Sequence, residues 1–540
     1  MMGLTRMSDY ARQSKRWGRG AVGLALGLSL GALGACEDLL DVKLPHLLTD
    51  AAIEGETTAQ TQVNSAMALF ECGYTAFGLM GMGAEDAMQS IAGVAGGMHV
   101  YDDTPDTGGC DGSSSSDSWF DQIMGTRSLI STSPDRLVAS GTGAGRGVYD
   151  RIQDEWELGS AGERLSAIAS IYMAASLAHM GEFLCEMSLD ESDLITPTQM
   201  LSLAEGWITN NALGHIASYG DFEMPNGAAT SATSMAMSIR ARIRWASGNL
   251  SGAAADAATI PDGFTAWVTR EAGATRRNKI YHSATEVGFS GMLGVNNWWN
   301  SAIRRPNPVT GQPWPDPIPF TGYIFLGIMD DGRTLEAGNL PVRWAEETRD
   351  GSDNPISLNN GAVADTRVLH HIQPIQGPVP EEVPDRYSAN DNDVPYSSWE
   401  EMRLIEAGMA HSQGNFAGAI GFVNRLRDSH GLPRISGAYE ATLLADGTAV
   451  RAMLMEERRR EFFAEGARYW STKIQNTDIL WFPRRQGDTP FQGYALLGAV
   501  RQLFAGDEYI LNPYFEALGG LDARGTGCTS LPGSQAPKFN

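Results

Sequence analysis

One stretch near the C-terminus decides how this chain is interpreted: residues 453–470 read MLMEERRREFFAEGARYW. Its apolar residues recur at three- and four-residue steps, which predicts a single helical run over the whole stretch. Three acidic residues, Glu457, Glu461 and Glu465, follow one another at four-residue spacing. Like charges at that spacing repel by a few tenths of a kcal/mol on an isolated helix, so the stripe predicts cations that answer it.

The cations nearest to this stripe in the sequence are Arg458, Arg459, Arg460 and Arg468. Carboxylates without a nearby histidine make a poor transition-metal site. We therefore interpret Glu457, Arg458, Glu461, Glu465 and Arg468 as a structural ion-pair network between packed helices. The alternative is that the stripe faces solvent and binds a partner.

The same block resembles the C-terminal helix of the SusD/RagB family, whose members are outer-membrane nutrient-binding lipoproteins. The matching positions are Glu457-Arg458, Glu461, Glu465-Gly466 and Arg468-Tyr469-Trp470, whereas Ser471-Thr472 stand where the family prefers Asp-Leu. Further fragments that resemble family motifs lie within 365–368, 393–407 and 424–433, and Gly408 stands where the family often has Glu. The resemblance implies a mostly α fold, a SusD-like helical frame with tetratricopeptide-like hairpins and long irregular loop insertions.

The N-terminus has the pattern of a bacterial lipoprotein signal. Basic residues between Arg12 and Arg19 precede an uncharged apolar stretch, Ala21–Leu33, which is too short to span a bilayer as a helix. The sequence Leu-Gly-Ala-Cys that ends at Cys36 resembles a lipobox. We expect residues 1–35 to be a signal peptide and Cys36 to carry the lipid. The alternative is ordinary secretion with a chance cysteine.

The formal net charge of −24 excludes nucleic acid as a partner, because the phosphate backbone would repel the chain. Four cysteines follow Cys36, and an oxidising compartment permits two disulfides among three pairings. Matching the two in helical patterns and the two in Gly-rich loops suggests Cys72–Cys185 and Cys110–Cys528.

Two segments repeat one pattern of small residues. They are Gly248-Asn249-Leu250 and Gly414-Asn415-Phe416. Each is preceded by a helical pattern, and a Gly-Ala pair begins two residues after its Leu or Phe. A glycine can end a helix in a left-handed turn, and the Leu or Phe then starts the buried face of the next helix. The pattern is typical of a tetratricopeptide-like helical hairpin. We expect these hairpins to be frame rather than ligand site.

The mature chain, 36–540, is expected to form a single SusD/RagB-like domain. Its parts would be an N-terminal helical half (36–261), a loop-rich insertion (262–396) and a C-terminal helical part (397–540). Helical periodicity covers about 50–80, 145–187, 197–218, 231–260, 397–430 and 449–470. The insertion is dense in Pro, Gly and Asn and offers short strands at 323–328 and 367–375.

Aromatic residues in the loop-rich segments are the candidate ligand-binding residues. They are Trp298 and Trp299 with the neighbouring Asn300, together with Trp314 and Tyr101. A sugar ring has an apolar face and a rim of hydroxyls, so flat aromatics beside amides suit it. The alternative is a satellite core beneath long loops.

Motifs of metalloproteases, P-loop enzymes and α/β-hydrolases are absent from the sequence, and no catalytic residues are assigned. We expect no enzymatic activity, no cofactor and no metal centre. Two acidic loops, 102–111 and 391–393, could hold calcium through oxygen ligands, but neither has an EF-hand pattern.

Taken with the resemblance, these features predict a cell-surface lipoprotein on the outer face of the outer membrane. It would capture oligosaccharide or peptide and deliver it to a TonB-dependent SusC-like barrel. One alternative is a surface-anchored hydrolase, such as a glycosidase that uses paired carboxylates. Another is a structural interaction protein that binds no ligand.

Overall fold

The computed structural model describes residues 55–84, 88–89, 127, 129–131, 147–185, 187–189, 194–273, 276–285, 294–295, 342–343, 363–364, 366–368, 370–373, 381–476, 501–502, 512–517 and 519–520. Except for Gly55, all of them belong to one compact unit, Glu56–Asn540. Within these residues no helix is long and apolar enough to cross a membrane.

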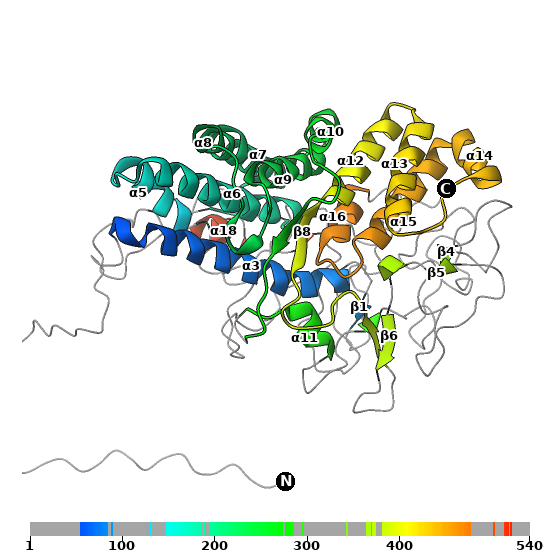
Figure 1. Cartoon of the computed structure of the whole chain (residues 1–540), viewed down its shortest axis with the longest axis horizontal. Coiled ribbons are helices and arrows are strands. Elements are labelled where there is room, and N and C mark those ends of the chain that lie inside the picture. The colour runs from blue at the N-terminus through cyan, green and yellow to red at the C-terminus, as the bar shows by residue number, and fades with distance from the viewer. Residues whose placement is uncertain are drawn as a thin grey trace, which may run out of the picture. The chain divides into compact units, whose positions relative to one another are not determined.

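The described part of the chain is mostly helical, as the sequence predicts (Figure 1). The helices of the N-terminal half are η1 (Glu56–Thr58), α3 (Ala59–Ala84), α5 (Val148–Asp154), α6 (Gly159–Phe183), α7 (Pro197–Gly206), the π-helical η2 (Trp207–Ala212), α8 (Leu213–Tyr219), η3 (Pro225–Gly227), α9 (Ala232–Ala246) and α10 (Leu250–Ala257). Those that follow are α11 (Lys279–Thr285), η5 (Thr366–Val368), α12 (Trp399–Ser412), α13 (Phe416–Ser429), α14 (Gly437–Ala445), α15 (Gly447–Glu461), α16 (Arg468–Gln475) and α18 (Pro513–Ala517).

The described strands are short and pair two by two. They are β1 (Met88–Gln89), β2 (Thr265–Val268), β3 (Gly294–Val295), β4 (Val342–Arg343), β5 (Val363–Ala364), β6 (His370–Gln373), β7 (Glu381–Pro384) and β8 (Val394–Ser398). The pair β4 and β5 is parallel, whereas β1 with β3, β2 with β8 and β6 with β7 are antiparallel. The β2–β8 pair joins the chain after α10 to the start of α12, with Thr265 opposite Ser398.

Both predicted hairpins are present, α9 with α10 and α12 with α13. Gly248 and Gly414 have φ of +84° and +73°, the left-handed conformation that ends the first helix of each pair. The next residue, Asn249 or Asn415, caps the second helix by accepting a hydrogen bond from the backbone N–H three residues on. Figure 1 shows the hairpins in succession, with α10 packed against α12 although a long stretch of sequence separates them.

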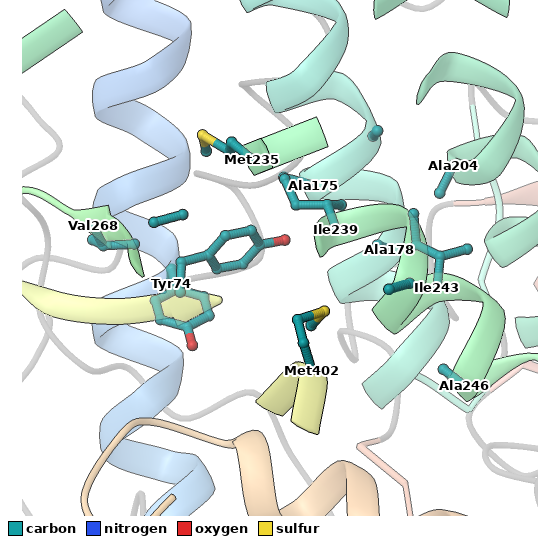
Figure 2. Close-up of a cluster of buried hydrophobic side chains, with 14 of the residues drawn as sticks. Tyr74, Ala175, Ala178, Ala204, Met235, Ile239, Ile243, Ala246, Val268 and Met402 are labelled. Carbon is teal, nitrogen blue, oxygen red and sulfur yellow. The ribbon is translucent and has the colours of Figure 1, made fainter. Parts of the chain in front are cut away.

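One part of the buried core lies between α6 and α9, beside α3. Small residues on α6, including Ala175 and Ala178, face Ile239 and Ile243 of α9 (Figure 2). Small side chains let the two helix backbones approach closely. Tyr74 of α3 lies in the same cluster and is fully buried.

The prediction of a single helical run over 453–470 is wrong. The stretch forms two helices, because α15 ends at Glu461 and α16 begins at Arg468. Between them Ala464 and Gly466 have φ of +58° and +80°. A Cβ on Gly78 of α3 would lie 3.0 Å from the Gly466 Cα, so the turn passes directly against the α3 backbone and needs glycine at both positions.

The region predicted to be loop-rich contains more regular structure than expected. The predicted strand at 367–375 is a 3-10 turn, η5, followed by strand β6, and α11 lies where no helix was predicted. The other proposed strand, 323–328, lies outside the described residues. Helix α14 was also not predicted.

Candidate functional site

The acidic stripe is buried and paired, but mostly with cations from elsewhere in the chain. Glu457 accepts hydrogen bonds from Arg427 Nε at 2.9 Å and Arg367 Nη1 at 2.8 Å. Glu461 lies 3.3 Å from Arg367 and 3.1 Å from His430. Burial opposes ionisation of Glu457, yet Arg427 and Arg367 lower its pKa to about 2. This carboxylate is therefore a buried anion fixed by two arginines.

Glu465, in the turn between α15 and α16, pairs with Arg468 and with Arg386. Arg468 also reaches Glu401 of α12 at 2.7 Å. Of the cations nearest in the sequence, Arg468 pairs with a member of the stripe, whereas Arg459 binds Glu456. Partners were thus missed because they come from α13, η5 and the chain before β8.

A second buried group of charges adjoins the first. Arg242 of α9 binds Glu182 of α6 at 2.8 Å, and both side chains are at most 5% exposed. Burial alone would raise the pKa of Glu401, but Arg468, Arg242 and Arg458 together hold it below its usual value. These ion pairs hold α6, α9, α12 and α16 to one another, which is a structural role.

Arg458 is the arginine of this group whose positive charge is least compensated by a nearby carboxylate. Its Nε donates to Thr472 Oγ1 at 2.8 Å, and its Nη2 lies 3.9 Å from Glu401. Its guanidinium carbon lies 4.3 Å from the ring centroid of Trp245. No hydrogen-bond acceptor among the described residues reaches Nη1, although the side chain is only 3% exposed. Burial lowers the pKa of Arg458 to about 10.

Arg458 lines a pocket of about 290 Å³ between the α9–α10 turn, α12, α15 and α16. One wall is a face of α12 with Leu404, Gly408 and His411, at positions one and two turns apart. The facing stripe of α15 runs from Arg451 through Met455 to Arg458. Gly248 and Ser412 are exposed at its rim, and Arg458 and Leu454 are buried at its base.

The polar groups of the pocket are cationic or neutral. Arg451 donates from Nη2 to Asn476 Oδ1 at 2.8 Å, and His411 Nε2 donates to the Gly447 carbonyl at the same distance. The described residues that line the pocket include no Asp or Glu. A surface pocket with two guanidiniums and no carboxylate is unexpected in so acidic a chain. The sequence did not predict this pocket. Of its lining residues, only Gly408 stood out in the sequence, as a departure from the SusD/RagB pattern.

The candidate ligand-binding residues named from the sequence, Trp298, Trp299, Asn300, Trp314 and Tyr101, lie outside the described residues. Cys36, Cys110 and Cys528, and the acidic loop 102–111, lie outside them too. Cys72 and Cys185 are each disulfide-bonded, and their pairing with one another stays a prediction.

The other acidic loop, 391–393, is described. There Asn392 Oδ1 accepts hydrogen bonds from the backbone N–H groups of Ser388 and Ala389, and Asp393 Oδ1 accepts one from that of Arg270. Within the described ranges no three His, Cys, Asp or Glu side chains are grouped as metal ligands.

Solved structures with the same fold cover most of the chain. Three are Bacteroides fragilis NanU, a SusD superfamily protein from B. fragilis and a SusD-like protein from Bacteroidetes, which share 10%, 12% and 11% identity with it. Each has a TM-score of 0.50 and aligns with 85% of this chain and 96–98% of its own. The chain has the SusD-like fold. No family model and no curated protein sequence matches it.

Proposed function

We propose that this SusD-like chain is a cell-surface lipoprotein that captures a nutrient, most readily an oligosaccharide, and passes it to a TonB-dependent barrel of the SusC type. The observation that carries the proposal is the fold, which aligns with nearly the full length of SusD-like structures. The lipobox-like sequence that ends at Cys36 supports it independently. Peptide is the second class of nutrient that the resemblance implies.

Binding without catalysis suits the chemistry of the described residues. A glycosidase needs a carboxyl group that protonates the leaving oxygen and a second that acts as base or nucleophile. The buried carboxylates Glu457, Glu461 and Glu465 are each held by arginine or histidine in pairs that join helices. These paired carboxylates therefore belong to the frame, and we propose that the nutrient is bound by loops on that frame.

Binding is tested with the purified full chain in detergent, by calorimetry against a panel of oligosaccharides and peptides. We expect an oligosaccharide to bind and replacement of both Trp298 and Trp299 by Ala to weaken binding by about tenfold or more, because each ring can bury an apolar surface worth about 1.5–3 kcal/mol. Circular dichroism and melting of the variant show whether its fold is intact. Binding of peptides alone would change the substrate class, and failure of the whole panel would contradict the proposal.

The membrane anchor is tested with Cys36→Ala. We expect the variant to lose lipid labelling and either to leave the membrane fraction or to keep its signal peptide. A Cys72→Ala variant is the control, because this cysteine lies in α3 and should leave lipid labelling unchanged. Normal labelling of Cys36→Ala would overturn the lipoprotein assignment. Co-purification of a large barrel protein with the wild type would support the proposed partner.

A further inference from the structure

One buried cation beside the pocket between α12 and α15 lacks a close carboxylate partner among the described residues. Among the described residues, Arg242 pairs with Glu182, whereas Arg468 and Arg458 both face Glu401. Glu401 is already engaged by Arg468 at the short distance of 2.7 Å, and Arg458 stands off at 3.9 Å. Arg458, which lines the pocket, is therefore the arginine of this group that is held least closely by a carboxylate.

A buried guanidinium with an unused N–H group carries a desolvation cost that a bound anion would relieve. Arg458 is 3% exposed, and no acceptor among the described residues reaches its Nη1. The Trp245 ring covers it on one side and Thr472 Oγ1 holds its Nε, so its orientation is fixed. Arg451, two turns earlier on α15, adds a second cation to the same pocket. These features suit one negative group.

Gly408 keeps the pocket open. It lies in the interior of α12, where glycine costs about 1 kcal/mol relative to alanine, so local helix stability does not explain it. A Cβ built on it meets no atom within 4 Å, which places free space directly above the residue.

We propose that the pocket binds a small organic carboxylate, whose anionic group pairs with Arg458 and Arg451 in the space above Gly408. Its volume of about 290 Å³ is at the lower end for ligand pockets, which suits a molecule the size of a monosaccharide or an amino acid. Leu404, Leu454 and Met455 would contact an apolar face of the ligand. The inference does not depend on the proposed function, because no residue of the loop-borne candidate site takes part.

Calorimetry with matched pairs of probes tests the charge requirement on the full chain. The pairs are D-glucuronate with D-glucose, and N-acetylleucine with its amide; inorganic phosphate is a separate probe. We expect at least one carboxylate to bind about tenfold or more tightly than its neutral match, because the neutral probe cannot form the charge-assisted hydrogen bonds to Arg458 and Arg451. The pair that responds distinguishes an acidic sugar from a peptide terminus. Equal binding within both pairs, or binding of phosphate alone, would overturn the proposal.

The variant Gly408→Glu tests the location. Its side chain should fill the pocket and supply an internal carboxylate, so the responding probe should bind about tenfold or more weakly while the melting temperature rises. Gly421→Glu is the matched control, because Gly421 also lies inside a helix, α13, is exposed and has open space around its Cβ position. It gains the same helix propensity and should leave probe affinity unchanged.

If Gly408→Glu does not fold, Arg451→Gln replaces it, with the exposed Arg434→Gln as its control. Retained affinity in the folded pocket variant would overturn the site. Loss of oligosaccharide binding with intact carboxylate binding would contradict only the proposed function.

Discussion

Helices α6 and α15 are both buried, but they are built from opposite kinds of residue. From Leu165 to Phe183, every residue of α6 is buried, and most are Ala, Ile, Leu or Met. From Ala452 to Glu461, every residue of α15 is buried too, and its last six are all Glu or Arg. Burial of α6 is favourable by itself, whereas burial of α15 is tolerable only because partners neutralise it.

The comparison predicts that removal of one buried charge from α15 strongly destabilises the protein. In Glu457→Ala, Arg367 and Arg427 keep their buried positions and lose the carboxylate that both contact. We expect a loss of about 3–5 kcal/mol in the free energy of unfolding, because an uncompensated buried charge remains. Urea unfolding measures it.

The control is Asp428→Ala, which removes a carboxylate that is 50% exposed and pairs with Arg434 at the surface. It should cost about 0–1 kcal/mol. Similar costs for the two variants would mean that the network around Glu457 is solvated, and the contrast between α6 and α15 would disappear.

In α6 the largest expected effect is steric rather than electrostatic. Ile171 is fully buried in the core, so Ile171→Ala should cost about 2–5 kcal/mol through lost burial and a residual cavity. Ile171→Val is the graded control and should cost about 0.5–1.5 kcal/mol. Added salt should leave both values unchanged. A strong salt dependence would show that α6, with its buried Glu182, is also governed by charge.

The sequence predicted these two helices unequally well. The apolar pattern of α6 is self-sufficient, and the glycine turns of both hairpins are local signals, so each could be recognised without tertiary information. In α15 the sequence shows that cations are needed but not where they are, because Arg367 and Arg427 reach Glu457 only after folding. The break at Gly466 had a local signal, a glycine at a helix end, which the spacing of charges obscured.

The candidate site was still less accessible to sequence reasoning. The pocket needs four separated segments: the turn at Gly248, the α12 face with Gly408, the α15 face with Arg458, and the end of α16 with Gln475. No spacing within one segment indicates that they meet. The aromatic residues proposed as ligand contacts stay a prediction, because they lie outside the described residues.

The smallest expected effect concerns His430, a partly exposed member of the ion-pair network around Glu461. His430 is 24% exposed and lies 3.1 Å from Glu461. Burial opposes its protonation, but the hydrogen bond and charge of Glu461 raise its pKa above the usual 6.5. Because the pKa is higher in the folded state, the stabilisation is complete below about pH 6.5 and is lost as pH rises through the raised pKa.

His430→Gln removes this titrating charge from the network while keeping a polar side chain. We expect it to cost about 0.5–1 kcal/mol near pH 5.5, the upper range for an exposed ion pair, and almost nothing near pH 9, where the wild-type imidazole is neutral. Urea unfolding of both proteins at the two pH values gives the difference. A cost that is the same at both pH values would show that His430 contributes packing alone. Glu461 would then depend on Arg367, its other partner among the described residues, for its compensation.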